Sequence, residues 1–305
     1  MIRTSILLCW GLLLATGGRT PSQTPAPVTV TAPITAPVTY EAFAIRFGIL
    51  PAFPVASLVA GAERDRRLDA PFMVWLLKGS NGRNVLIDSG FYRQKFLDQW
   101  KPRDFRTPAA AVAAAGVAPE AVTDVIISHA HWDHVGGADL FPKATIWIQR
   151  EEYRYYTGEA WHAGNTHGGI DEDDMTALVK INMAGRLRFV EGDDQEVLPG
   201  IRAYTGGRHT WASQFVSAPL RGPAASAGQA VTAAGTAVFT SDNVYLYENL
   251  DKRAAIAQTL DAASNLKAQD RIRTLASNPR LIVPGHDPAV FERFERVAEG
   301  IVRIK

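Results

Sequence analysis

The sequence predicts an α/β fold, and two mixed sheets flanked by helices is the layout that fits it. Strand-like apolar runs alternate with helical segments from Thr39 to the C-terminus, and this rhythm recurs loosely in both halves. The chain has 305 residues, 47% hydrophobic and 21% charged, which excludes disorder along its whole length. Alternation alone does not prove that there are two sheets, so that arrangement is an expectation at this point.

Apolar runs bounded by turn residues predict the strands. In chain order they are Tyr40–Ile49, Phe72–Lys78, Asn84–Asp88, Val122–Ser128, Ala144–Gln149, Leu187–Val190, Ile201–Tyr204, Gln214–Ala218, Ala237–Ser241 and Arg280–Val283.

Helices are predicted at three places. A proline opens the alanine-rich segment Pro108–Ala115, and a glycine follows its end. A long helix is predicted over Lys252–Ala276, where an Asn-Pro pair stops it. A last helix is predicted over Pro288–Ile301.

Two segments between these elements predict loops. Ala218–Gly235 is rich in Ala, Gly, Ser and Pro, which indicates a flexible hairpin loop rather than a linker between domains. Trp161–Asp174 is polar and contains glycines, which indicates a surface insertion. His162 and His167 lie in this insertion and match no ligand motif, so we predict surface residues rather than parts of a lid.

Residues 1–22 predict a secretory signal peptide. Arg3 precedes an apolar stretch, Ile6–Ala15, and small residues follow it. The stretch is shorter than the roughly 20 residues that span a bilayer core, so no stable membrane insertion is expected. Cleavage between Ala15 and about Thr24 would place the mature protein in the periplasm or outside the cell. Cys9 is the single cysteine, which excludes an internal disulfide and a cysteine-based zinc cluster.

The rest of the chain divides into two parts. Residues 23–38 are rich in Pro and Thr, which indicates a disordered linker, and residues 39–305 form the folded domain. Lys plus Arg number 32 and Asp plus Glu number 31, so the formal charge is +1. This balance argues against a nucleic-acid partner, which usually requires a basic excess. The oligomeric state stays open, a homodimer included.

A dense cluster of metal-ligand side chains follows the fourth predicted strand. The motif is Ser128-His129-Ala130-His131-Trp132-Asp133-His134. Imidazole nitrogens and carboxylate oxygens suit Zn²⁺ and similar metals. His129 and His131, two residues apart in extended backbone, point the same way, and a turn lets Asp133 and His134 reach a second position. Four ligands would fill the coordination sphere of a single tetrahedral ion and leave no open position. Two ions that share a bridging ligand therefore fit the motif better.

Three later residues complete the ligand set. His209, Asp242 and His286 each lie at a strand end or a glycine turn, where a loop presents a ligand from a rigid frame. Taken alone, each histidine would more often be an ordinary surface or core residue, and Asp242 a turn residue. The cluster upstream makes all three candidate ligands.

The order His-x-His-x-Asp-His, followed by His, Asp and His, resembles the metallo-β-lactamase superfamily of metal hydrolases, from Tyr40 to the C-terminus. The resemblance implies a four-layer αβ/βα sandwich with the site at one edge. Leu86-Ile87-Asp88-Ser89-Gly90 resembles the first motif of the superfamily, whose aspartate supports the metal loop without being a ligand. The resemblance implies a first metal held by His129, His131 and His209, a second held by Asp133, His134 and His286, and Asp242 as the bridge.

Within the superfamily, the chain looks most like the N-acyl-homoserine lactonase family. True zinc β-lactamases lack a bridging aspartate at the position of Asp242. Tyr245 matches a tyrosine that contacts the substrate carbonyl in the lactonases, although it can equally be an aromatic packing residue. Gln214 also resembles that family. Trp211 departs from it, because the lactonases have a small turn there, and this side chain would crowd or line the pocket.

The resemblance implies a hydrolase with two Zn²⁺ per chain, or other divalent transition metals, that acts on a small-molecule lactone or a related ester. A metal-bridging hydroxide would attack the carbonyl carbon. Tyr245 would donate to the developing oxyanion, and Asp133 would carry a proton to the leaving group. The alternatives are a β-lactamase, a phosphotriesterase or a thioesterase of the same superfamily, and a metal-binding or scaffold protein with an inactive site.

Overall fold

Two mixed β-sheets pack face to face in the part of the chain that the computed structural model describes, residues 37–165, 167–222 and 233–305. The strands of the first sheet are β1 (Tyr40–Pro54), β2 (Arg67–Gly79), β3 (Asn84–Ile87), β4 (Asp124–Ile126), β5 (Thr145–Gln149), β6 (Leu187–Val190), β12 (Glu295–Ala298) and β13 (Ile301–Ile304). Those of the second are β7 (Gln195–Leu198), β8 (Ile201–Thr205), β9 (Gln214–Arg221), β10 (Ala233–Ser241) and β11 (Ile282–Pro284).

The strand order explains why both sheets are mixed. In the first, β1, β2 and β3 are antiparallel neighbours, and β3, β4, β5 and β6 then run parallel. In the second, β7 to β10 are antiparallel and β11 is parallel to β10. One parallel pair, Tyr40 with Leu220, joins the sheets into a continuous path.

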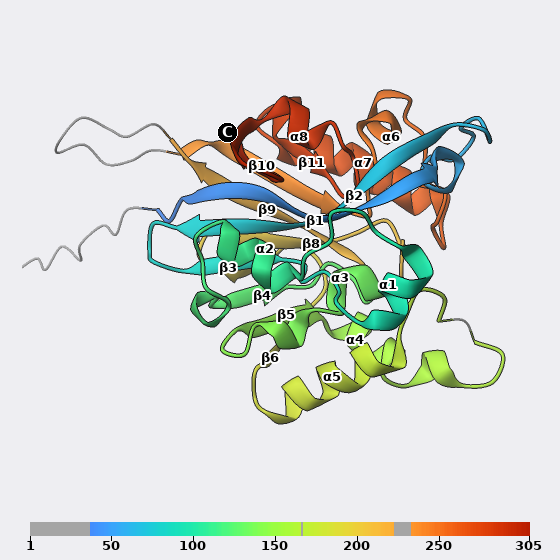
Figure 1. Ribbon diagram of the computed structural model, residues 1–305, viewed down its shortest axis with the longest axis horizontal. Helices are drawn as coiled ribbons and strands as arrows, with labels where there is room; N and C mark the ends of the chain where they lie inside the picture. The colour runs from blue at the N-terminus through green and yellow to red at the C-terminus, as the bar shows by residue number, and fades with distance from the viewer. Residues whose placement is uncertain (1–36, 166, 223–232) are drawn as a thin grey trace, which may run out of the picture. The chain divides into compact units, whose positions relative to one another are not determined.

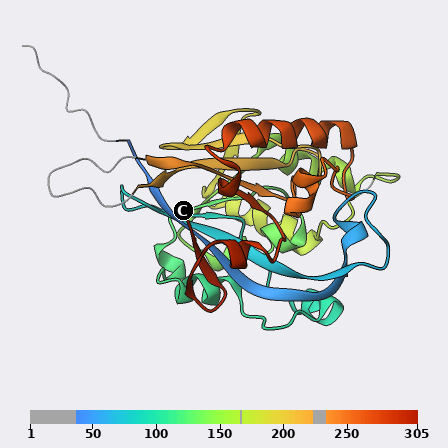
Figure 2. The ribbon, with the colours of Figure 1, turned by 90° about the horizontal axis from the view of Figure 1, so that it is seen from above.

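Helices cover the outer face of each sheet, and Figure 1 and Figure 2 show the layers from two sides. The helices are α1 (Gln94–Trp100), α2 (Pro108–Ala114), α3 (Trp132–Val135), α4 (Arg150–Tyr156), α5 (Glu172–Met183), α6 (Tyr247–Asp251), α7 (Ala262–Leu275) and α8 (Val290–Arg293). Side chains of α1, α2, α4 and α5 pack on the first sheet, and those of α7 pack on the second. The predicted four-layer α/β fold is confirmed.

Alternation along the strands creates these layers, because successive side chains of a strand point to opposite faces. On β2, Trp75 and Leu77 lie between the two sheets, whereas Val74 and Leu76 face the helices. On β10, Phe239 lies in the same central layer. Strand β2, which is apolar on both faces, is therefore buried on both sides.

The predicted helix over Lys252–Ala276 is wrong in its first part, because helix α7 begins only at Ala262. The side chain of Asp261 caps it by accepting a hydrogen bond from the backbone of Ser264. The residues before it take an irregular path that buries Ile256 and bridges it to Val59. Tertiary packing therefore overrides the local helical pattern.

The predicted helix over Pro288–Ile301 is also wrong. Only Val290–Arg293 is helical, and the chain then forms a hairpin whose second strand, β13, pairs with β1. Gly300 makes the turn with a φ of +69°, which a glycine adopts without strain. The alternation that buries Val302 and Ile304 between the sheets is a strand pattern that the prediction missed.

The remaining expectations have mixed outcomes. Helix α2 begins at Pro108 as predicted, and β9 and β10 form the predicted hairpin, whose loop residues 223–232 lie outside the described residues. Helices α1, α3, α4, α5 and α6 and strand β7 were not predicted. The predicted signal peptide, residues 1–22, and residues 23–36 of the predicted linker also lie outside the described residues. Among the described helices, none combines the length and apolar character needed to cross a bilayer.

Candidate metal centre

The seven predicted ligands come together where strands of both sheets end. His129 and His131 follow β4, and His209 lies in the loop after β8. Asp242 and His286 follow the parallel pair β10 and β11. The other two, Asp133 and His134, lie on the short helix α3. The ends of parallel strands meet at one edge of a sheet, so segments far apart in sequence contribute to one site.

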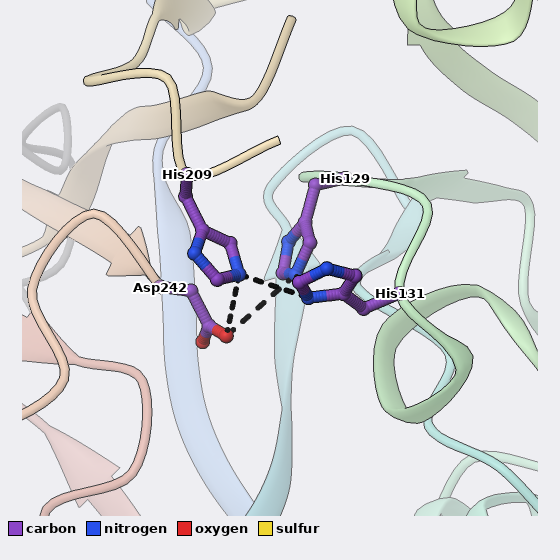
Figure 3. Close-up of side chains that lie close together, drawn as sticks. All are labelled: His129, His131, His209 and Asp242. Atoms are coloured by element: carbon purple, nitrogen blue, oxygen red, sulfur yellow. Dashed lines mark hydrogen bonds and ion pairs between the residues drawn. The ribbon is translucent and has the colours of Figure 1, made fainter. Parts of the chain in front are cut away.

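One group of ligand atoms contains three imidazole nitrogens. Nδ1 of His131 lies 3.1 Å from Nε2 of His129 and 2.9 Å from Nε2 of His209. Figure 3 shows these rings pointing toward one another and toward Asp242. A tetrahedral zinc ion with bonds of about 2.0–2.1 Å sets its ligand nitrogens about 3.3 Å apart, close to the spacing of these pairs. The first group therefore fits a metal ion.

The second group consists of Asp133, His134 and His286. Oδ2 of Asp133 lies 3.6 Å from Nε2 of His134 and 3.8 Å from Nε2 of His286. This division of ligands is the one that the family resemblance implies. The positions of metal ions within it stay a prediction.

Asp242 stands between the two groups with one oxygen toward each. Oδ2 lies 3.3 Å from Nε2 of His209 and 3.6 Å from Nε2 of His129. Oδ1 lies 3.4 Å from Nε2 of His134 and 3.1 Å from Nε2 of His286. This is the geometry that a carboxylate needs to bridge two cations.

Two buried polar atoms at the centre, Nε2 of His134 and Oδ1 of Asp242, have no hydrogen-bond partner among the residues that the structure describes. Leaving a buried donor or acceptor unpaired costs about 1–3 kcal/mol. Both atoms face the space between the ligands, so a cation there would satisfy the acceptor lone pairs. The donor set of nitrogen and oxygen atoms fits the metals predicted from the sequence.

The outward nitrogens of three ligand rings have hydrogen-bond partners that hold the rings in place. Nδ1 of His134 donates to Asp88 at 2.8 Å, and Nδ1 of His209 donates to the carbonyl of Gln258 at 2.6 Å. Nδ1 of His286 donates to the carbonyl of Pro71 at 3.0 Å. Such partners fix the tautomer and orientation of metal ligands.

Asp88 has the supporting position that the resemblance implies. Its fully buried carboxylate accepts hydrogen bonds from the backbone of Ser128 at 2.7 Å, from the Ser128 hydroxyl at 2.9 Å and from the Ser241 hydroxyl at 3.0 Å. Asp88 thus ties the loop before His129 to the loop before Asp242. The backbone at Asp88 has a φ of +61°, so this contact is made from a conformation that side chains rarely adopt.

The ligand groups differ in how they bind protons. Burial lowers the pKa of His129 and His131 well below the ordinary value, and the neighbouring histidines add to this. Burial also acts to lower the pKa of His134 and His286, but the carboxylates of Asp242 and Asp133 outweigh it and raise both values. At neutral pH, protons therefore compete less with a cation for His129 and His131 in the first group than for His134 and His286 in the second.

Comparison with a family model decides the family. The model of the metallo-beta-lactamase superfamily matches residues 73–286, a span that includes all seven ligands. This chain belongs to the metallo-beta-lactamase superfamily. The predicted resemblance and the predicted enzyme class, a metal-dependent hydrolase, are confirmed.

Individual members of the superfamily show similarity over most of the chain. The N-acyl homoserine lactonase AttM of Azorhizobium caulinodans is 27% identical over 248 residues, 77% of this chain and 88% of that protein. A quorum-quenching N-acyl homoserine lactone lactonase of known structure superposes with a TM-score of 0.67 at 18% identity, covering 86% and 98% of the two chains. AidC, a dizinc quorum-quenching lactonase, gives a TM-score of 0.60 at 15% identity, covering 88% and 98%. Both structures share the superfamily fold.

An apolar cavity of about 280 Å³ opens onto this superfamily centre. Its apolar wall is formed by Leu50, Phe53, Leu58, Ala70, Phe72, Trp100 and Trp132, and its polar end by His131, Asp133, Asp242, Tyr245 and His286. The indole of Trp132 stacks on Phe96 and Trp100 and is thereby held rigid.

Tyr245 lies at the polar end of this cavity, beside two of the candidate ligands. It lines the cavity, and its ring centre is 5.6 Å from that of His209 and 5.7 Å from that of His286. Burial raises its pKa well above the ordinary value, and the Asp242 and Asp133 carboxylates add to this. The phenol therefore keeps its proton as a hydrogen-bond donor.

Other sequence-based expectations near the centre need correction or refinement. Trp211 does not line this cavity. Its ring stacks on that of Tyr155 with the ring centres 4.0 Å apart, and the side chain is partly exposed. His162 and His167 are exposed as predicted, but the insertion around them is more than surface, since Gly168 and Gly169 line the cavity. A side chain at Gly169 would come within 2.7 Å of the His131 ring. No motif in the sequence indicated this contact.

Proposed function

We propose that this protein is a dinuclear metal hydrolase that opens N-acyl-homoserine lactones or closely related lactones and esters. The observation that carries the proposal is Asp242, whose two oxygens face two separate groups of histidines at the end of an apolar cavity. The similarity to the lactonase AttM supports the choice of substrate.

Each part of the centre has a role in this reaction. Two zinc ions, or other divalent transition metals, would supply a hydroxide nucleophile at neutral pH and polarise the substrate carbonyl. The Tyr245 hydroxyl donates to the carbonyl oxygen as negative charge develops on it. Asp133 lines the cavity beside His286 and carries a proton to the leaving alkoxide. The apolar wall receives the acyl chain and excludes water.

The test is turnover of a substrate panel by zinc-loaded protein whose metal content is known. Lactone hydrolysis well above that of β-lactam, phosphotriester and thioester substrates is the expected result. Dominant turnover of one of the other three classes would replace the lactone proposal with that activity. No turnover of any acyl-homoserine lactone would overturn it.

Tyr245→Phe tests the oxyanion contact, because it deletes the hydroxyl and keeps the ring that packs beside His209 and His286. Losing a main oxyanion donor costs about 10²–10³ in rate, but a metal shares the task here, so a loss of roughly 10-fold in kcat is expected. Zinc content and melting temperature should match the parent. Steady-state kinetics on acyl-homoserine lactones of several chain lengths measure it, and a variant equal to the parent would reduce Tyr245 to a packing residue.

We also propose that the mature protein is periplasmic or secreted. The charged start and short apolar stretch of residues 1–22 support this. In a Gram-negative host the mature chain should begin between Ala15 and about Thr24, and fractionation should find it outside the cytoplasm. N-terminal sequencing that returns Met1 or Ile2 on cytoplasmic protein would contradict the proposal.

A further inference from the structure

A buried carboxylate outside the ligand set connects the two loops that carry the first group of histidines. Glu152 lies in the first turn of α4 and is completely buried. Its Oε1 accepts from the backbone N–H of Ala130 at 2.9 Å and from the hydroxyl of Thr210 at 2.6 Å. Its Oε2 accepts from the backbone N–H of Ala212 at 2.6 Å.

The partners of Glu152 are close to metal ligands in sequence. Ala130 stands between His129 and His131, and Thr210 follows His209 directly. One carboxylate therefore holds the backbones on which all three imidazoles of the first group are mounted. A second hydrogen bond joins helix α4 to the loop after His209, because the Tyr156 hydroxyl accepts from the backbone N–H of Trp211 at 3.3 Å.

Placing a carboxylate here is costly for folding alone. Removing an ionised group from water is strongly unfavourable unless other groups compensate it. Among the described residues, Glu152 has no ion-pair partner, and its hydrogen bonds all go to the two ligand loops. An apolar side chain would fill the space at lower cost, but it could not fix these loops relative to one another.

We infer that Glu152 is a positioning residue that sets the spacing of His129, His131 and His209 and so tunes the affinity of the first metal site. The inference rests on the proposed dinuclear centre, since it concerns how the chain presents ligands to one of its ions. It assigns Glu152 no contact with substrate.

Glu152→Gln is the sharpest variant because it keeps the volume of the side chain. A glutamine offers one acceptor oxygen and one amide nitrogen. If the amide oxygen faces Ala130 and Thr210, the amide nitrogen faces the N–H of Ala212, and two donors meet. In the opposite orientation the amide nitrogen faces the donors of Ala130 and Thr210. At least one loop contact is lost in either case, while the packing is retained.

The control is a second buried carboxylate, on strand β4 of the first sheet. Asp124 is 1% exposed and accepts from Arg83 at 2.7 Å, from Thr123 at 2.7 Å and from Trp147 at 3.0 Å. Asp124 lies at the start of β4. At about 3.3 Å per residue of extended chain, it is roughly 16 Å from His129 along the backbone. Asp124→Asn disturbs a similar network without touching the ligand loops.

The experiment measures zinc affinity by competition with a chromogenic chelator, together with melting temperature, for the parent and both variants. Glu152→Gln should weaken one of the two zinc sites by about 10–100-fold and leave the other near the parent value. Asp124→Asn should lower the melting temperature and leave both zinc affinities at the parent values. An anomalous diffraction map of the glutamine variant should show the weaker peak beside His131.

The outcomes separate this inference from the proposed function. A parent that binds two zinc ions and a Glu152→Gln variant that binds both equally well would overturn the positioning role and leave the dinuclear centre standing. If Asp124→Asn weakened zinc binding as much as Glu152→Gln does, the positioning role would also be overturned, since the effect would then be general destabilisation. A parent that binds no zinc would overturn the proposed function and this inference together.

Discussion

Replacing Asp242 with alanine is expected to reduce zinc from about two ions per chain toward one or fewer and to lower lactone hydrolysis by orders of magnitude. Each oxygen of this carboxylate faces a different pair of histidines, so its loss removes one ligand from each group. Without the bridge, the two cations also lose the negative charge that reduces their mutual repulsion.

Metal analysis and steady-state kinetics on the same preparation measure this effect. Asp242→Asn serves as a graded variant, because an amide oxygen can still serve one side of the bridge. Asp270→Ala serves as the control, since Asp270 pairs with Arg253 at the surface and should leave zinc content unchanged. An Asp242→Ala variant with the parent's zinc content and rate would contradict the assignment of Asp242 as the bridge.

Removing the metals from the parent protein is expected to abolish hydrolysis and lower the melting temperature. A ligand that binds only the folded chain at 1,000 times its dissociation constant stabilises it by about 4 kcal/mol. Chelation followed by dialysis should produce this loss, and added zinc should restore both activity and stability. Activity that survives with less than a tenth of an ion per chain would exclude a metal-dependent reaction.

The metal sites should also differ in their response to pH. In the metal-free chain the pKa values of His134 and His286 are raised, so a proton must leave before a metal enters the second group. Those of His129 and His131 are lowered, so the first group meets little proton competition. Zinc per chain at fixed free zinc should therefore fall from about two to about one as pH drops below neutrality, with the second group emptied first. Simultaneous loss from both groups would contradict this order.

The raised pKa values of His134 and His286 also contribute to the stability of the metal-free protein. A raised histidine pKa stabilises the fold fully below the unfolded value of about 6.5, and this contribution is lost as pH rises through the folded value. Protons on His134 and His286 thus partly replace the missing cation at low pH. The gain in melting temperature on adding zinc should accordingly be larger at pH 8 than at pH 6.

The seven candidate ligands could be picked out from the sequence because their signal is local and dense. Metal-ligand types from His129 to His134 cluster directly after a strand, and His209, Asp242 and His286 follow recognisable strand ends or glycine turns. The structure places all seven at one edge of the sandwich, as the resemblance implied. The supporting role of Asp88 was also available, since it follows a strand in a motif of its own.

The parts that were missed depend on contacts between distant segments. Glu152 sits in an ordinary charged run beside Glu151, and only the fold reveals that one of the pair is buried and the other exposed. Gly169 contacts His131 across a loop whose polar composition indicated surface. Strand β13 is only four residues long, and the pairing with β1 that holds it joins the two ends of the domain.

The sequence also carries a helix-start signal at Asp171. Asp171 precedes three acidic residues, Glu172, Asp173 and Asp174, and its side chain accepts from the backbone N–H of Asp173. An Asp cap followed by negative charge in the first turn is typical of a helix start. Helix α5 therefore could have been predicted, and the insertion Trp161–Asp174 would then have ended earlier.

The most direct test of the dinuclear centre is anomalous X-ray diffraction at the zinc absorption edge from crystals of zinc-loaded protein that hydrolyses an acyl-homoserine lactone. Two peaks are expected on either side of the Asp242 carboxylate. One should contact His129, His131 and His209, and the other Asp133, His134 and His286. A single peak, or two peaks of which neither contacts Asp242, would contradict a bridged pair of metals as the catalytic centre.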